Sequence, residues 1–318
     1  MPFKPIKIEE RGKFGYYEAT LIKVGKEKIL YVTIPYKGCT KKPRCLFCGV
    51  QERPNPNLKI NRKFGDEVMR KIKKYVSYYS PDSLVLYNGG NILREKEMYQ
   101  PTILVEIPKY IARHKKCKIY EIEARVDDVI HFRKKLEIIK FHLKNKKLRI
   151  RLGIEYFDDK LLERHRKGNN TRQIQEAVNI LNELGIEWNG YLMLGGLDMK
   201  REEAREVAIK TGRFMIDNNA FKISINGIFV TKTLQKVFGN RIYVPDYSDL
   251  VFVLKELCRY RDEKRSKVLF KVGFVEEYTQ AIVQFPYFSN KNNLKEIVER
   301  LNKFNITQDI RDLGAKIN

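Results

Sequence analysis

Three of the chain's five cysteines lie in one short stretch, GCTKKPRCLFCGV (residues 38–50). Cys39, Cys45 and Cys48 form a CX5CX2C arrangement directly after the apolar run KILYVTIPY (28–36). Thiolates grouped in this way bind metal ions or iron–sulfur clusters. A disulfide framework is not expected, because such frameworks belong to small secreted domains and this chain has 318 residues.

The number of available ligands favours a cluster over structural zinc. Zinc usually takes four protein ligands in two close pairs, and this loop offers one pair and one further thiol, with no histidine in residues 1–113. Cys117 begins a predicted strand at its other end, and Cys258 is expected to pack in a helix as a small apolar residue. A [4Fe–4S] cluster with three cysteine ligands keeps a free coordination site on its fourth iron.

Predicted strands and helices alternate along the rest of the chain. Apolar runs predict strands at 28–36, 83–90, 118–126, 148–157, 187–196 and 221–230. Helical periodicity predicts helices at 65–79, 101–116, 129–144, 171–185, 201–217 and 247–265. Six strand–helix units in succession predict a parallel sheet, either doubly wound or curved towards a barrel, whose chemistry lies in the loops after the strands.

Other unusual residue groups fall at that same edge. The sequence NGG (88–90) ends the second strand, EAR the third, and LGG the fifth, while GIE lies in the fourth. Each has an ordinary structural interpretation as well: the glycines form a turn, and Glu123 with Arg125 forms a surface ion pair. Their common position after the strands is what favours a functional site.

The charge of the chain predicts an anionic partner. Lysine and arginine number 63 against 39 acidic residues, which gives a net charge of +24. Such a field attracts polyanions, of which nucleic acid is the usual one. The candidate phosphate contacts are the basic helix 129–144, the run KNKKLRIR (144–151), and Lys41, Lys42 and Arg44. These runs have an alternative interpretation as solvated helix faces.

The remaining composition predicts a soluble cytoplasmic protein without membrane contact. The apolar fraction is 43%, typical of a folded protein, and no run approaches the length of a membrane span. The first residues lack the apolar core of a signal peptide. We expect a lead-in at 1–28 with a hairpin-like pattern, a core at 29–265, and a small α+β extension at 266–318.

The cysteine loop, with Phe47 before its last cysteine, resembles that of the radical S-adenosylmethionine (SAM) enzymes, although their commonest spacing is CX3CX2C. The resemblance runs over residues 29–230. It implies an α/β fold, a partial (β/α)6 barrel of the TIM type, and a [4Fe–4S] cluster on Cys39, Cys45 and Cys48. SAM would bind the free iron and yield a 5′-deoxyadenosyl radical.

The resemblance also implies a set of SAM contacts. In the family the turn after the second strand binds the methionine amino group, and here Asn91 stands where an acidic residue is usual. The end of the third strand lies near the ribose, the G-hydrophobic-E motif contacts the cofactor, and a later basic residue, here Arg166 or Lys167, meets the carboxylate. The implied contacts are Phe47, Asn88, Gly89, Gly90, Glu123, Arg125, Glu155 and Lys167.

A narrower resemblance concerns residues 151–196, together with TIP before the first cysteine and ISINGIFVTKTL in the sixth strand. They resemble the group of the elongator catalytic subunit and, more closely, the archaeal radical SAM subunit of archaeosine synthase. This implies a C–N bond-cleaving, lyase-type tRNA modification of a lysine-bearing 7-deazaguanine. The implied partners are tRNA, a lysine-transferring subunit and a reductant protein.

Two alternatives remain open at this stage. One is a radical SAM enzyme that acts on a small molecule, peptide or lipid, and the other is a zinc-stapled RNA-binding protein. The sequence does not identify the residues that act on the substrate.

Overall fold

The computed structural model describes the greater part of the chain. The described residues are 6–24, 26–37, 39, 45–47, 57–89, 92–94, 101–228, 230–273, 282–284, 287 and 294–314. Several residues singled out by the sequence lie outside them, namely Cys48, Gly90, Asn91, Lys41, Lys42 and Arg44.

One nine-stranded sheet organises the molecule, in the order β1-β2-β3-β4-β5-β6-β7-β9-β12. From β3 to β12 each strand is parallel to its neighbour. The strands are β1 (Ile6–Gly12), β2 (Gly15–Val24), β3 (Glu27–Thr33), β4 (Ser83–Tyr87), β5 (Ile119–Arg125), β6 (Lys147–Glu155), β7 (Glu187–Leu194), β9 (Lys222–Gly227) and β12 (Leu269–Val272). Two short pairs lie apart from it, β8 (Gly196–Leu197) with β11 (Ile242–Tyr243) and β10 (Val230–Thr231) with β13 (Ile282–Gln284).

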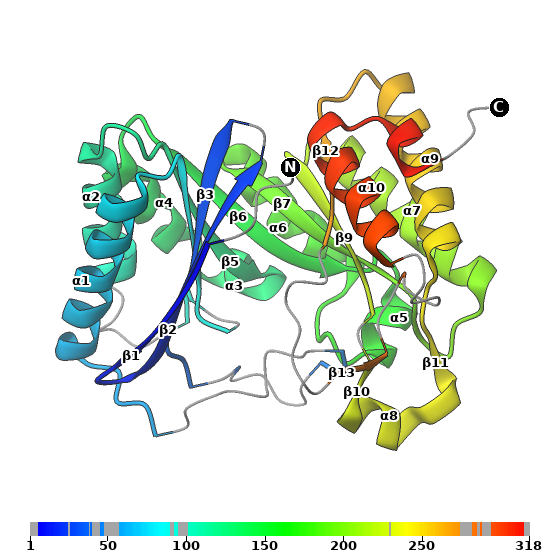
Figure 1. Ribbon diagram of the computed structural model, residues 1–318, viewed down its shortest axis with the longest axis horizontal. Helices are drawn as coiled ribbons and strands as arrows, with labels where there is room; N and C mark the ends of the chain where they lie inside the picture. Colours follow the sequence, from blue (N-terminus) through cyan, green and yellow to red (C-terminus); the bar gives the residue numbers. More distant parts are fainter. Residues whose placement is uncertain are drawn as a thin grey trace.

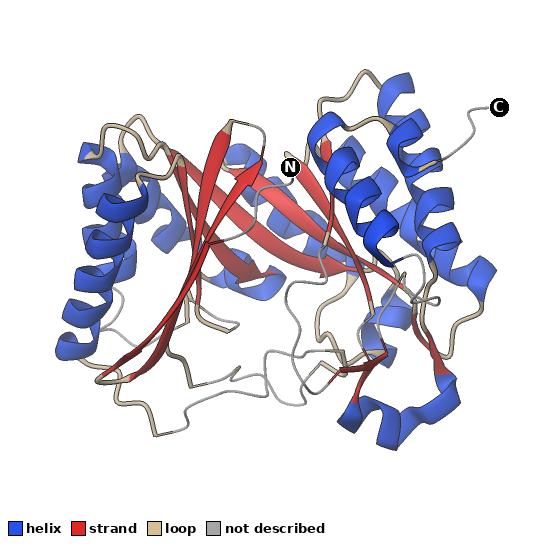
Figure 2. Cartoon of the chain, viewed as in Figure 1, coloured by secondary structure: helices blue, strands red, loops and turns tan. Residues whose placement is uncertain are grey.

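Helices cover the outer side of the curved sheet (Figures 1 and 2). The helices are α1 (Arg62–Tyr79), α2 (Ile107–Arg113), α3 (Val126–His131), α4 (Arg133–Leu143), α5 (Asp159–Arg164), α6 (Thr171–Glu183), α7 (Arg201–Asp217), α8 (Lys232–Phe238), α9 (Tyr247–Glu263) and α10 (Leu294–Thr307). Of these, α8 lies apart from the nine-stranded sheet, at its lower edge beside β10 and β11 (Figure 1). The prediction of an α/β partial barrel with a parallel sheet is confirmed.

The two faces of the sheet differ in chemistry. Side chains on the outer face, such as Leu30, Ile122 and Ile223, are fully buried under the helices. On the inner face the side chains are largely polar. Some are half-buried, such as Tyr31 and Lys222, and others are buried, such as Glu121 and Arg151. Because strand side chains alternate between faces, the apolar outer face forms the core and the inner face forms a polar lumen.

Two predicted helices differ in detail. The helix predicted at 101–116 begins with a π-helical segment, Thr102–Glu106, before α2. Pro108 lies at this junction and has no N–H to donate to the carbonyl four residues back, which explains the wider turn. The helix predicted at 129–144 begins earlier, at Val126, and breaks at Phe132 into α3 and α4.

The flanking segments extend the same sheet. Strands β1 and β2 pair antiparallel with each other, and β2 pairs antiparallel with β3. At the other edge β12 pairs parallel with β9. The division of the chain at residues 28 and 265 stays a prediction. No helix among the described residues combines the length and apolar character needed to cross a membrane.

Candidate active site

The loop that carries the cysteines is joined to the strands by backbone hydrogen bonds. Ile34 N donates to Tyr87 O at 2.9 Å and holds the carboxyl ends of β3 and β4 together. Further along the loop, Leu46 N donates to His165 O at 3.1 Å. Ile34 therefore lies at the carboxyl end of β4, and Leu46 lies against the segment that follows α5.

Arg125, at the end of β5, is close to both described cysteines of the loop. Its Nη1 atom lies 3.9 Å from Cys45 Sγ, and its charge also interacts with Cys39. Both cysteines are partly buried. No three Cys, His, Asp or Glu side chains gather as a metal site within the described residues, and the third cysteine, Cys48, lies outside them.

The other two cysteines belong to the core. Cys117 is completely buried, and its thiol donates to Ile119 O at 3.7 Å. Burial raises the pKa of the Cys117 thiol to about 12 and that of Cys258 to about 11. Both thiols therefore stay protonated, unlike a metal ligand. The expectation that Cys258 packs as a small apolar residue is met, since it is 6% exposed.

Acidic side chains fix Arg125 in place. Its Nε donates to Asp127 at 2.9 Å and its Nη2 to Lys167 O at 3.0 Å, while Arg94 pairs with Asp127 and Asp128. Burial alone would lower the pKa of Arg125, but Asp127 and then Cys45 raise it above its usual value. A permanent cation therefore lies beside the cysteine loop. The surface ion pair considered for Glu123 and Arg125 is wrong, because Arg125 is only 8% exposed.

Glu155 and Lys167 form a buried ion pair beside this network, with Lys167 Nζ 3.1 Å from Glu155 Oε1. The register of β6 against β7 shifts between Gly153 and Glu155, and Glu155 has a φ of 66°. Such an irregularity re-aims a side chain at the end of a strand. A Cβ on Gly153 would lie 2.8 Å from Lys167 Nζ, so the glycine leaves room for the lysine.

Phe47 lies between this ion pair and two aromatic side chains that the sequence did not reveal as site residues. Its ring centroid is 5.7 Å from Lys167 Nζ, 6.5 Å from the ring of Tyr156 and 5.9 Å from that of His165. His165 Nε2 accepts from Leu197 N at 2.9 Å, and burial lowers the pKa of this histidine. His165 is therefore a neutral packing residue in the wall of the site.

The turn after β4 has no room for a side chain. Gly89 has a φ of +69°, and a Cβ there would overlap the ring of Tyr36. Asn88 is 4% exposed, and its Nδ2 has no hydrogen-bond partner among the described residues. Asn169, two residues after Lys167, is 8% exposed, and neither of its side-chain polar atoms has a hydrogen-bond partner among the described residues. Buried polar atoms of this kind are expected to bind a ligand or water.

Glu123 lies on the inner face of the sheet, two residues before Arg125 along β5 and therefore further from the carboxyl end of the strand. It is in register with Arg151 on β6. Burial chiefly, and the Glu123 carboxylate in addition, raise the pKa of Tyr191 on β7. Glu123 therefore faces the lumen between β4 and β7. The structure thus gathers Phe47, Arg125, Glu155 and Lys167, and their contact with SAM stays a prediction.

Comparison with known proteins decides the family. The model of the radical SAM superfamily matches residues 33–208, more than half of the chain. The chain belongs to the radical SAM superfamily. Its members use a [4Fe–4S] cluster and SAM, which are the cofactors predicted from the sequence. No curated protein sequence matches the chain at a significant level.

Solved structures show the same fold at low identity. Coproporphyrinogen III oxidase (HemN) of Escherichia coli is 15% identical with a TM-score of 0.50, over 74% of this chain and 52% of that protein. Archaeal Elp3 of Methanocaldococcus infernus is 15% identical with a TM-score of 0.54, over 73% and 58%. Methylornithine synthase (PylB) is 13% identical with a TM-score of 0.50, over 87% and 82%. The chain spans little more than half of the first two.

The residues present fit both cofactors. Cys39 and Cys45 lie beside the cation of Arg125, and together with Cys48 they would supply the three thiolates that a cluster with one open iron needs. The orphaned Asn88 Nδ2 and the ion pair of Glu155 with Lys167 offer polar contacts for SAM. When bound, these cofactors supply a one-electron cleavage that gives a 5′-deoxyadenosyl radical.

Proposed function

We propose that this radical SAM enzyme modifies tRNA, by C–N bond cleavage of a lysine-bearing 7-deazaguanine that forms archaeosine. The observation that supports tRNA as the partner is the excess of positive charge, 63 basic residues against 39 acidic residues. Nucleic acid is the partner that such a field attracts most strongly, because each phosphate contact releases condensed counterions.

Exposed basic residues follow the carboxyl ends of several strands. Lys37 follows β3, Arg166 follows α5, Lys200 follows β8, and Lys232 begins α8 after β10. In a parallel barrel these connections surround one mouth. Cations around the mouth would hold the backbone of a tRNA while one nucleotide, turned out of its stack, enters the lumen.

Two other basic residues do not lie where they could contact the backbone of a tRNA. Arg149 and Arg151, in the run predicted to contact phosphates, are 4% and 6% exposed and face the lumen. They pair with Glu187 and Glu121. The prediction of surface phosphate contacts is therefore wrong for these two, because alternation along β6 turns them inward.

The choice of reaction rests on the sequence resemblance. Residues 151–196 and the sixth strand resemble the archaeosine synthase subunit, and Elp3 of M. infernus is among the structures that share the fold. A lysine-transferring subunit and a reductant protein are part of this proposal. The competing function is a radical SAM reaction on a small molecule, peptide or lipid.

The test measures 5′-deoxyadenosine from the anaerobically reconstituted, reduced holoenzyme with SAM. Archaeal tRNA that bears the lysine adduct is compared with the same tRNA without it. We expect product to rise only with the adduct, and mass spectrometry of the digested tRNA to show archaeosine. Product that is indifferent to either tRNA would favour the competing function.

Binding to tRNA gives an independent test. We expect log K to fall linearly with log salt, and the double variant Lys200→Ala/Lys232→Ala to reduce the slope by about 1 to 2. Lys264→Ala is the matched control, since Lys264 caps the far end of α9. An equal effect of the control would contradict binding at the mouth.

A further inference from the structure

A basic surface lies at the amino ends of the parallel strands, opposite the edge where the candidate active site is found. It is formed where α1, α2 and α4 end side by side, just before the chain enters β4, β5 and β6 (Figure 1). Residues 109–118 carry five lysine or arginine side chains, residues 140–147 carry four, and neither segment contains an acidic residue. The two segments therefore concentrate positive charge at one corner of the molecule.

Hydrogen bonds join the parts of this surface. Lys146 Nζ, after α4, donates to His114 O, after α2, at 3.2 Å. The hydroxyl groups of Ser77 on α1 and Tyr110 on α2 lie 3.3 Å apart. The three helix ends are thus in contact, and their basic side chains belong to one continuous surface.

The surface is hollowed at the end of α2. A pocket of about 420 Å³ is lined by Ser80, Tyr110, Arg113, His114, Lys115 and Lys116, and no acidic side chain is among these described residues. The side chains of Arg113, Lys115 and Lys116 are exposed, and none of them forms an ion pair within the described part of the chain. The pocket therefore presents three positive charges to solvent.

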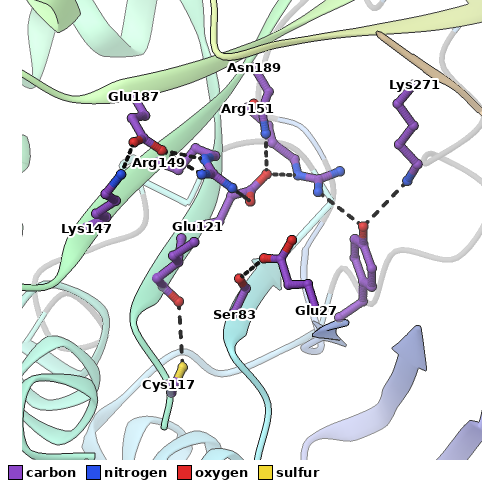
Figure 3. Close-up of polar contacts among 12 residues, drawn as sticks. Glu27, Ser83, Cys117, Glu121, Lys147, Arg149, Arg151, Glu187, Asn189 and Lys271 are labelled. Atoms are coloured by element: carbon purple, nitrogen blue, oxygen red, sulfur yellow. Dashed lines mark hydrogen bonds and ion pairs between the residues drawn. The ribbon is translucent and has the colours of Figure 1, made fainter. Parts of the chain in front are cut away.

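Two acidic side chains at this edge of the sheet already have partners. Asp82 accepts from Lys28 N at 2.8 Å. Glu187 pairs with Lys147 and with Arg149 (Figure 3). Neither acid lines the pocket, so neither neutralises its charge.

The positive potential extends into the pocket wall and is more than a helix-end effect. Burial first, and the charge of Lys146 in addition, lower the pKa of His114 below its usual value. Cations at the carboxyl end of a helix ordinarily neutralise the helix dipole. In this chain, however, α6 ends at Glu183 and α7 at Asp217, with no basic residue in the last turn of either helix. The charge beside α2 and α4 therefore needs a further explanation.

Two exposed aromatic rings flank the basic side chains. Tyr78, in the last turn of α1, is 76% exposed, and Phe141, in the last turn of α4, is 75% exposed. Large apolar rings are usually buried, whereas exposed rings among cations are the surfaces on which nucleic-acid bases stack. The rings favour RNA over a free phosphate ion or an acidic polypeptide as the ligand.

We propose that this surface binds a tRNA at a distance from the nucleotide to be modified. A backbone phosphate would occupy the pocket between Arg113, Lys115 and Lys116, and bases would stack on Tyr78 or Phe141. The inference rests on the proposed function for its choice of tRNA as the RNA.

The length of β5 places this surface relative to the candidate active site. Lys118 precedes the strand and Arg125 ends it, seven residues later. At the rise of a parallel strand this corresponds to about 20 Å. A folded RNA is large enough to contact both ends of the barrel. The basic surface would then orient the tRNA while one nucleotide enters the mouth.

The test is the binding of tRNA without the lysine adduct to the reconstituted holoenzyme, measured anaerobically over a range of salt concentrations. We expect Lys115→Gln/Lys116→Gln to weaken binding about tenfold or more. The slope of log K against log salt should fall by about 1 to 2, since each phosphate contact contributes about 0.7 to 0.9. Phe141→Ala should weaken binding several-fold without changing this slope, because stacking releases no counterions.

A matched pair of lysines serves as the control. Lys264→Gln/Lys267→Gln removes the same charge at the same edge of the sheet, beyond α9, and should change binding by less than about twofold. Arg113→Gln repeats the test if the variant of Lys115 and Lys116 fails to fold. Unchanged binding in the pocket variants, or equal weakening by the control pair, would overturn the proposal.

Competing ligands distinguish RNA from other anions. Poly-L-glutamate that displaces the tRNA as well as unlabelled tRNA does would assign the surface to an acidic protein, and displacement by inorganic phosphate at constant ionic strength would assign the pocket to a free anion. Either result would overturn the proposal. Because the tRNA carries no adduct and no product is measured, failure here is distinct from failure of the proposed reaction.

Discussion

Replacement of Lys167 by methionine tests the buried ion pair at the heart of the candidate site. The side chains of Lys167 and Glu155 are 7% and 10% exposed, and their charged atoms lie 3.1 Å apart. Methionine keeps the apolar stem of the lysine but removes its charge. Glu155 then remains as a buried carboxylate without its partner.

The expected loss follows from the burial of both groups. Removal of one partner from a buried ion pair costs about 3 to 5 kcal/mol, because the remaining charge is uncompensated. The lower end applies here, since Glu155 can regain some water at the mouth. We therefore expect Lys167→Met to lower the free energy of unfolding by about 3 kcal/mol. The double variant Lys167→Met/Glu155→Gln should lose only about 1 kcal/mol, because no buried charge is left.

The assay is anaerobic urea unfolding of the wild type, both single variants and the double variant, with binding of SAM measured in parallel. Lys160→Met, on the exposed side of α5, is the control and should change stability by less than about 0.5 kcal/mol. A loss of less than about 0.5 kcal/mol for Lys167→Met would refute the reasoning, as would strict additivity in the double variant.

Three further predictions concern the turn, the strand end and the lumen. Gly89→Ala should destabilise the protein by about 2 kcal/mol in urea unfolding, because alanine is strained at a φ of +69°; a neutral effect would contradict the described turn. Gly153→Ala should displace Lys167 and weaken SAM binding at least several-fold, with little change in the secondary structure seen by circular dichroism. Ultraviolet titration should show that Tyr31 ionises below its usual pKa of 10, and Lys271→Gln should move it upward. Because its folded pKa is the lower one, this tyrosine contributes stability above pH 10 that is lost as pH falls through the folded pKa; unchanged ionisation in Lys271→Gln would contradict the arrangement.

Much of the fold follows from local sequence. Runs of apolar residues and helical periodicity depend on neighbours in the chain, so the six predicted strands and six predicted helices between 28 and 265 agree with the structure to within a few residues. The short elements α5, α8, β8, β10 and β11 were not predicted. The face of the sheet to which a charged strand residue points could not be predicted from local sequence. Arg149 and Arg151 were interpreted as surface cations because their acidic partners, Glu121 and Glu187, lie on other strands.

The residues of the candidate site also fall into those that local sequence indicates and those that it does not. Spacing alone selected the cysteines as candidates, and the order of motifs along the strands selected Arg125, Glu155 and Lys167, which the structure brings together and whose contact with SAM stays a prediction. His165, Tyr156 and Asn169 were not identified as wall or ligand-facing residues, because an isolated histidine, tyrosine or asparagine carries no spacing signal. Their positions depend on how the loop at 45–47 packs over the segment after α5.

The central claim is that Cys39, Cys45 and Cys48 hold a cluster whose open iron takes SAM. The most direct test is anaerobic reconstitution of the wild type, Cys45→Ser, Cys48→Ser and the buried control Cys117→Ser, followed by reduction, addition of SAM and measurement of bound iron, sulfide and 5′-deoxyadenosine. The account predicts cluster and product in the wild type and in Cys117→Ser, and loss of both in the two loop variants. A Cys48→Ser variant that keeps its cluster and still releases 5′-deoxyadenosine would contradict it.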